Sequence, residues 1–151
     1  MQKTIGVFFG SRSPEHDVSI ITAEFIIDGL RKLEKNVLPV YIGKDGVWNI
    51  SQELGKLSAF TKAQPIDPRA GGFDRYFLDL ENSRGRLVFQ KKSILGKSIA
   101  IDLAFPALHG SYGEDGTMQG LFEMFNLPYV GCDTASSAIA MDKVFTKMMY
   151  Q

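Results

Sequence analysis

Short apolar runs and one amphipathic pattern organise the first third of the chain. Residues 4–9 form an apolar run that stops at Gly10, a pattern typical of a strand buried on both faces of a sheet. Over residues 18–33, apolar side chains recur at steps of three and four, which places them on one side of a helix. A second strand is predicted over 37–42, where Pro39 favours an edge position or a bulge. This order predicts a right-handed crossover unit.

Turn-forming residues divide the middle of the chain. They predict two hairpins, with turns at 44–46 and 82–85 and strands at 47–50, 76–80 and 87–89. Prolines and glycines predict a loop that contains Pro65, Pro68, Gly71 and Gly72. A longer apolar run over 99–108 predicts one buried strand, which ends at His109.

Helical spacing returns in the last third. An apolar stripe from Met118 to Phe125 predicts a helix, a short strand is predicted over 127–130, and further helices over 136–141 and 144–150. Alternating strands and helices favour an α/β fold with an open, three-layer, mostly parallel sheet. Ligands of such sheets bind at the carboxyl ends of strands.

Composition narrows the function classes. The 151 residues suffice for one domain with a substantial core, and 17 basic residues balance 17 acidic ones, which disfavours nucleic acid and anionic membranes as partners. The first apolar run is too short for a signal peptide or a membrane span, so we expect a cytoplasmic protein. Cys132 stands alone, and two histidines form no zinc-like spacing, so neither a disulfide nor a metal site is predicted.

Two turns carry the candidate chemistry, residues 10–19 and 109–116. Each follows a predicted strand, and both should open on the same edge of the sheet. Neither matches a P-loop or the dinucleotide fingerprint. Their acidic side chains would repel a phosphate but attract a cationic group such as an ammonium.

Each candidate residue also has an ordinary structural interpretation. Glu15 fits the first turn of a helix that Ser13 caps, so capping stays open beside a ligand role. His109 fits a strand end that hydrogen-bonds a nearby carbonyl. Lys143 and Lys147 fit a solvated helix face. Three aspartates fit simple turns and helix caps: Asp115, Asp133 and Asp142.

Two segments together resemble the D-alanine-D-alanine ligase family. They read FFGSRSPEHDVS from residue 8 and FPALHGSYGEDGTMQGLFEMFNLPYVGCDTASSAIAMDKVFTK from residue 105. The resemblance covers essentially the whole chain, although residues 51–98 carry no motif of their own. One departure is Ser11, where many relatives have a second glycine.

The resemblance assigns roles to five residues. It implies that Glu15 anchors the ammonium group of the first D-alanine, with Val18 and Ser19 lining the same pocket. It implies that His109 positions that substrate through a hydrogen bond or proton exchange. Glu15 and His109 are thus the catalytic candidates. Lys143 is implied to reach the phosphates of ATP.

The resemblance also implies an organisation. Residues 1–140 would form a Rossmann-like domain that precedes the ATP-grasp domains, and 141–151 the truncated start of the central ATP-grasp domain. The full-length enzyme would use ATP and Mg²⁺ to join two D-alanines for peptidoglycan synthesis, and would form a homodimer. We expect this chain alone to be inactive, with exposed apolar residues where the next domain docks: Phe145, Met148 and Met149.

Two other functions stay open. A noncatalytic α/β binding module could use the same core, dimerising through its first helix. A flavodoxin-like or nucleotide-binding domain is suggested by the alternation of strands and helices alone. The residues present do not specify whether the second substrate is D-alanine or D-lactate.

Overall fold

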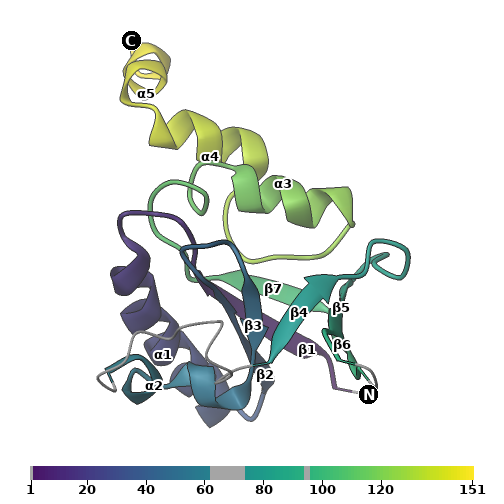
Figure 1. The fold of residues 1–151 in the computed structure, drawn as a ribbon. Helices are drawn as coiled ribbons and strands as arrows, with labels where there is room; N and C mark the ends of the chain where they lie inside the picture. Colours follow the sequence, from purple (N-terminus) through teal and green to yellow (C-terminus); the bar gives the residue numbers. More distant parts are fainter. Residues whose placement is uncertain (1, 62–73, 94–95) are drawn as a thin grey trace.

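The computed structural model describes residues 2–61, 74–93 and 96–151 (Figure 1). Its elements are β1 (Thr4–Gly10), α1 (His16–Lys32), β2 (Asn36–Ile42), β3 (Trp48–Ile50), the 3-10 helix η1 (Gln52–Gly55), α2 (Ser58–Thr61), β4 (Arg75–Leu78), β5 (Leu87–Lys91), β6 (Ser98–Ile101), β7 (Leu103–Pro106), α3 (Thr117–Met124), α4 (Thr134–Met141) and α5 (Lys143–Met149). The strand predicted over 127–130 is reduced to one bridge between Ala104 and Tyr129. The predicted loop with Pro65, Pro68, Gly71 and Gly72 lies outside the described residues.

Seven strands form one mixed sheet in the order β6-β5-β4-β3-β2-β1-β7. Only β2, β1 and β7 are parallel, and every pairing from β2 through β6 is antiparallel. The α/β class is therefore confirmed, but the prediction of an open, mostly parallel sheet is wrong. The physical reason is the pair of hairpins in the middle of the chain, because short turns join strands only in antiparallel order.

The apolar run 99–108 is two strands rather than one. The chain bends at Asp102, so that β6 pairs with β5 at one edge of the sheet and β7 pairs with β1 at the other. Asp102 fixes the bend, since its N–H donates to Thr4 O at 2.9 Å and its Oδ2 accepts from Thr4 N at 3.0 Å. One continuous segment thus joins both edges, and the sheet is nearly closed.

Helices cover the parallel strands on both faces. On one face α1, η1 and α2 pack over a core that includes Val7, Phe9 and Ile27. On the other, α3 packs over a core that includes Phe8, Phe89 and Phe122, closed from the side by the curled strands β3 to β6 (Figure 1). Alternate residues of β1 therefore serve two separate cores, as its unbroken apolar run predicts.

The buried face of α1 differs from the predicted one. Val18, Ile21 and Phe25 are 50%, 58% and 83% exposed, respectively. The helix instead buries a stripe with two small residues: Ser19, Ile20, Ala23 and Ile27. Small side chains let the helix lie close to β1, which periodicity of apolar residues alone does not reveal.

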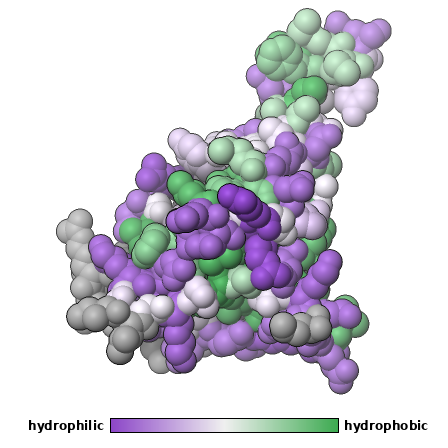
Figure 2. Space-filling model, turned by 90° about the vertical axis from the view of Figure 1, so that its right-hand side faces the viewer, coloured by the Kyte–Doolittle hydropathy of each residue, from purple (hydrophilic) through white to green (hydrophobic). Residues whose placement is uncertain are grey.

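Helices α4 and α5 project from the body (Figure 1). Only Ser137 of α4 is buried, and no residue of α5 is. Phe145, Met148 and Met149 are exposed as predicted, and apolar side chains gather over this projection in Figure 2. Among the described helices, none has the length and apolar character needed to cross a bilayer.

Candidate functional site

The turn after β1 depends on two left-handed residues. Gly10 has a φ of 91°, and a Cβ there would collide with Ile42 O. Ser11 follows with a φ of 73°, and its N–H donates to the same carbonyl at 2.7 Å. The left-handed conformation costs a non-glycine residue such as Ser11 about 1 kcal/mol, which explains why glycine would also suit position 11.

His16 is a structural residue of this turn. It is buried, with Nδ1 2.6 Å from Ser11 O and Nε2 3.1 Å from the Tyr41 hydroxyl. Because a carbonyl only accepts, Nδ1 carries the proton and Nε2 accepts from Tyr41. Burial raises the pKa of Tyr41 to about 12, which keeps the phenol a donor. His16 therefore holds the turn and is not available to a ligand.

Glu15 is not a capping side chain. The turn is closed by Ser13, whose Oγ accepts from Glu15 N at 3.1 Å and whose carbonyl accepts from His16 N at 3.1 Å. The Glu15 carboxylate accepts no hydrogen bond from the first turn of α1. Its side chain is exposed, and none of the salt bridges among the described residues involves it.

The turn after β7 lies beside the turn after β1. The two strands are parallel neighbours, so both turns open at the same edge, as predicted. Gly110, with a φ of 69°, makes the close approach possible. A Cβ at Gly110 would lie 2.8 Å from Ser13 Oγ and 3.3 Å from Glu15 Oε1. Only glycine both adopts this conformation and leaves room for Glu15.

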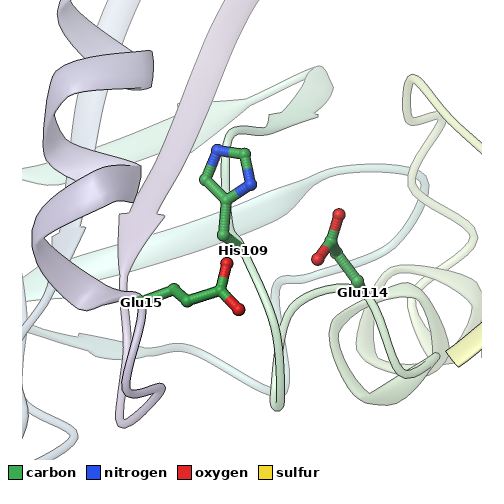
Figure 3. A group of neighbouring side chains, drawn as sticks. All are labelled: Glu15, His109 and Glu114. Atoms are coloured by element: carbon green, nitrogen blue, oxygen red, sulfur yellow. The ribbon is translucent and has the colours of Figure 1, made fainter.

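Glu15, His109 and Glu114 converge at this edge (Figure 3). One potential ligand atom from each lies within 4.8 Å of the others. We call these three residues the convergent cluster. Glu114 was not singled out by the sequence analysis, where it was one acid among several in the turn. Its Oε2 accepts from Gly110 N at 2.7 Å, which leaves Oε1 free.

The neighbouring acid, Asp115, serves the backbone, as its ordinary interpretation predicts. Its carboxylate accepts from Tyr112 N at 2.8 Å and from Thr117 N at 3.0 Å. Burial alone would raise the pKa of Asp115, but these hydrogen bonds outweigh it and hold the pKa below its usual value. Asp133 and Asp142 likewise cap α4 and α5.

A hydrogen-bond chain orients the His109 ring. His109 Nε2 lies 2.8 Å from Thr22 Oγ1, and that hydroxyl donates to Val18 O at 3.1 Å. Since the hydroxyl proton is used on Val18 O, the network assigns the imidazole proton to Nε2. In Figure 3 the other ring nitrogen faces Glu114. Thr22 is a second residue that the sequence analysis missed, because an isolated threonine on a helix carries no signal.

Val18 and Ser19 occupy different environments although they are adjacent. The Val18 side chain is half exposed on α1. Ser19 is fully buried, and its hydroxyl accepts from Gly10 N at 2.7 Å and donates to His16 O at 2.6 Å. The Ser19 hydroxyl thus ties α1 to the end of β1.

We expect Ser19→Ala to destabilise the chain by about 1–3 kcal/mol, because the buried Gly10 N–H would lose its acceptor. Urea unfolding followed by circular dichroism measures this. Ser111→Ala, which removes an exposed hydroxyl, should change the free energy of unfolding by less than about 0.5 kcal/mol. Equal stability of the two variants would contradict this role of Ser19.

Lys143 lies away from the convergent cluster, exposed at the start of α5. Backbone N–H groups there cannot receive a phosphate, since Asp142 Oδ1 accepts from Val144 N at 2.8 Å and from Phe145 N at 3.2 Å. Within the described residues, Lys143 thus has no accompanying phosphate cradle. The described residues do not by themselves form a binding site for the phosphates of ATP.

The convergent cluster is suited to a cation. It offers two carboxylates and an imidazole lone pair, and the salt bridges found among the described residues involve neither Glu15 nor Glu114. A primary ammonium has three N–H donors, which match three converging acceptors. The site can therefore hold the amino group of a small molecule.

The sequence profile described as "D-ala D-ala ligase N-terminus" matches residues 4–132. The chain is 39% identical to the D-alanine--D-alanine ligase of Thermosipho melanesiensis, covering 96% of this chain and 38% of that protein. It is 42% identical to that of Kocuria rhizophila, covering 97% and 39%. The chain thus spans about two fifths of the length of these curated relatives.

Solved structures agree with the sequence matches. The D-alanine-D-alanine ligase from Coxiella burnetii superposes with a TM-score of 0.76 at 29% identity, over 97% of this chain and 40% of that one. The VanG D-Ala:D-Ser ligase from Enterococcus faecalis gives 0.76 at 30% identity, over 99% and 41%. The chain therefore belongs to the D-alanine-D-alanine ligase family and corresponds to its amino-terminal domain.

Proposed function

We propose that this chain is the D-alanine-anchoring part of an ATP-dependent D-alanine-D-alanine ligase, which serves peptidoglycan precursor synthesis. The observation that carries the proposal is the convergent cluster. Its two carboxylates lie at the edge where β1 and β7 end, without a salt bridge among the described residues. Family membership supplies the substrate class.

Glu15 and the free oxygen of Glu114 would accept two N–H bonds from the ammonium of the first D-alanine. His109, with its proton on Nε2, would offer its other ring nitrogen to the third. Val18, half exposed one turn before Thr22, would line the pocket. Ser19 would support that pocket indirectly, because its hydroxyl accepts a hydrogen bond from Gly10 N and so fixes the turn after β1.

The remaining chemistry needs groups beyond those described here. Phosphoryl transfer from ATP to the first D-alanine requires cations and Mg²⁺ around the phosphates. In our proposal, downstream ATP-grasp domains supply these, with Lys143 as one contribution from this chain. The projection of α4 and α5 supports a boundary near residue 140, with 1–140 as the anchoring domain and 141–151 as the start of the next.

The second substrate is chosen elsewhere in this proposal. The VanG D-Ala:D-Ser ligase matches this chain over 99% of its length, and the D-alanine-D-alanine ligase from Coxiella burnetii matches it over 97%. A fold shared by both kinds of ligase does not discriminate between second substrates. The site of that choice is therefore assigned to the downstream domains.

A coupled assay of ADP release with D-alanine tests the proposal. It compares the 151-residue chain with the product of the same gene extended past Gln151. We expect turnover only in the extended protein, because the chain alone lacks a phosphate cradle among its described residues. Turnover in neither protein would favour a noncatalytic binding module. Turnover by the 151-residue chain alone would contradict the proposal that downstream domains supply the ATP site.

We further propose a cytoplasmic homodimer. Cytoplasmic placement follows from the proposed use of ATP. The exposed apolar stripe of Val18, Ile21 and Phe25 on α1 supports self-association, because apolar stripes of this kind favour burial against a partner. Sedimentation velocity should show a dimer, and Phe25→Glu should shift it to monomer at the same concentration. A monomeric parent chain would contradict this.

A further inference from the structure

A second ligand fits the convergent cluster. We infer that Glu15, His109 and Glu114 bind a divalent transition metal such as Zn²⁺, and that the metal excludes the substrate ammonium. The exclusion, but not the metal binding, rests on the proposed function. Spacings of cysteine and histidine along the sequence predict no metal site. This donor set is instead assembled from two turns that lie 94 positions apart in sequence, the difference between 15 and 109.

The donors suit zinc in type and position. Imidazole nitrogen with carboxylate oxygens is a zinc ligand set, while Mg²⁺ and Ca²⁺ prefer oxygen alone. Zinc bonds of about 2.0–2.2 Å place tetrahedral ligands roughly 3.4 Å apart. The observed donor atoms lie within 4.8 Å, and the Glu15 and Glu114 side chains are exposed. A shift of about 1.4 Å, chiefly of the exposed Glu15 carboxylate, would close the difference between this limit and the spacing of tetrahedral zinc ligands.

Two of the three donor residues are already oriented by hydrogen bonds to neighbouring groups, as the ligands of metal sites usually are. Histidine ligands usually hydrogen-bond through their second nitrogen, and His109 does so through Nε2 to Thr22 at 2.8 Å. Glu114 is fixed through Oε2 by Gly110 N at 2.7 Å. Each residue thus keeps one donor atom outside these hydrogen bonds, and Figure 3 shows the two side chains on neighbouring parts of the same turn.

A cavity of about 310 Å³ adjoins Glu114. It is lined in part by Leu108, Gln119 and Cys132. Gln119 is more than nine-tenths buried, and its amide nitrogen donates to Gly113 O at 2.9 Å. Its Oε1 has no partner within the described structure. A three-ligand zinc keeps an open position for water. Of the three donors only Glu114 borders this cavity, so the cavity offers space and an unused acceptor on the Glu114 side of the cluster.

Metal and ammonium would compete for the same atoms. Both need the Glu15 carboxylate, the free oxygen of Glu114 and the unprotonated nitrogen of His109. A divalent ion in that position would also repel a substrate ammonium. Zinc would therefore act as a competitive inhibitor at the first D-alanine site.

Calorimetric titration of ZnCl₂ into the 151-residue chain tests the inference. It is done in a Cys132→Ser background, because the exposed thiol beside the cavity is an alternative zinc ligand. We expect one Zn²⁺ per chain, with affinity at least about tenfold weaker in His109→Gln and in Glu114→Gln. Thr22→Val should weaken it by roughly tenfold through the lost support of His109. Glu81→Gln, an exposed acid outside the cluster, should leave it unchanged.

D-alanine binding, followed by NMR on the same samples, separates the two proposals. Zinc affinity that is unchanged in both His109→Gln and Glu114→Gln overturns the metal site, as does zinc binding that disappears in Cys132→Ser alone. Zinc binding without any D-alanine binding overturns the proposed function and leaves the metal site standing. Zinc affinity that saturating D-alanine does not reduce overturns the exclusion.

Discussion

Replacing Glu15 by glutamine should weaken D-alanine binding by roughly 10- to 100-fold, the loss of one hydrogen bond to a charged group worth about 1.5–3 kcal/mol. The substitution keeps the shape of the side chain and removes only its charge. Glu15 makes no capping bond, so α1 should remain intact. NMR titration of the 151-residue chain with D-alanine measures the change, with parent affinity expected near the millimolar range, where about 4 kcal/mol of binding energy suffices.

Asp17→Asn is the matched control for this experiment. Asp17 lies two residues away, and among the described residues its exposed carboxylate makes one long contact, with Lys44 Nζ at 3.7 Å. It lies outside the convergent cluster. The control removes the same charge from the same turn, so its affinity should change less than twofold. If both variants weaken binding equally, the effect is a general one of surface charge and Glu15 is not the anchor.

The largest loss of stability is expected for Phe122→Ala, about 3–5 kcal/mol. Phe122 is fully buried on α3, with its ring centroid 5.0 Å from that of Phe8 and 5.6 Å from that of Tyr129. The side chain attaches α3 to the sheet, and the turn with His109 leads into α3. Removing the Phe122 side chain leaves a cavity beside the rings of Phe8 and Tyr129. The melting temperature should fall by roughly 10 °C, as measured by calorimetry.

Met124→Ala tests whether the loss comes from burial. Met124 lies on the same helix but is 80% exposed, and alanine is at least as good a helix former. Its melting temperature should stay within about 2 °C of the parent value. A comparable loss in both variants would contradict the burial of Phe122 in the aromatic core as the source of the effect.

Prediction of the candidate site from sequence succeeded where neighbouring residues carry the signal. Two glycine-containing turns after apolar runs placed Glu15 and His109 at one edge, and parallel pairing of β1 with β7 confirms that shared edge. Glu114 and Thr22 were not predicted as site residues. The role of Thr22 depends on its contact with His109, which is 87 positions away in the sequence. The roles assigned to Val18, Ser19 and Lys143 remain proposals.

The sequence by itself determined most of the strands and the longer helices, the α/β class and, through two specific segments, the family. These depend on periodicity and on turn residues, which act over a few positions. Only the tertiary structure decided that the sheet is mixed and nearly closed, because the bend at Asp102 sends β6 and β7 to opposite edges. It also decided that α1 buries Ser19 and Ala23 rather than its larger apolar residues. Packing depends on contacts between segments that are far apart in the sequence, and a local sequence pattern does not specify those contacts.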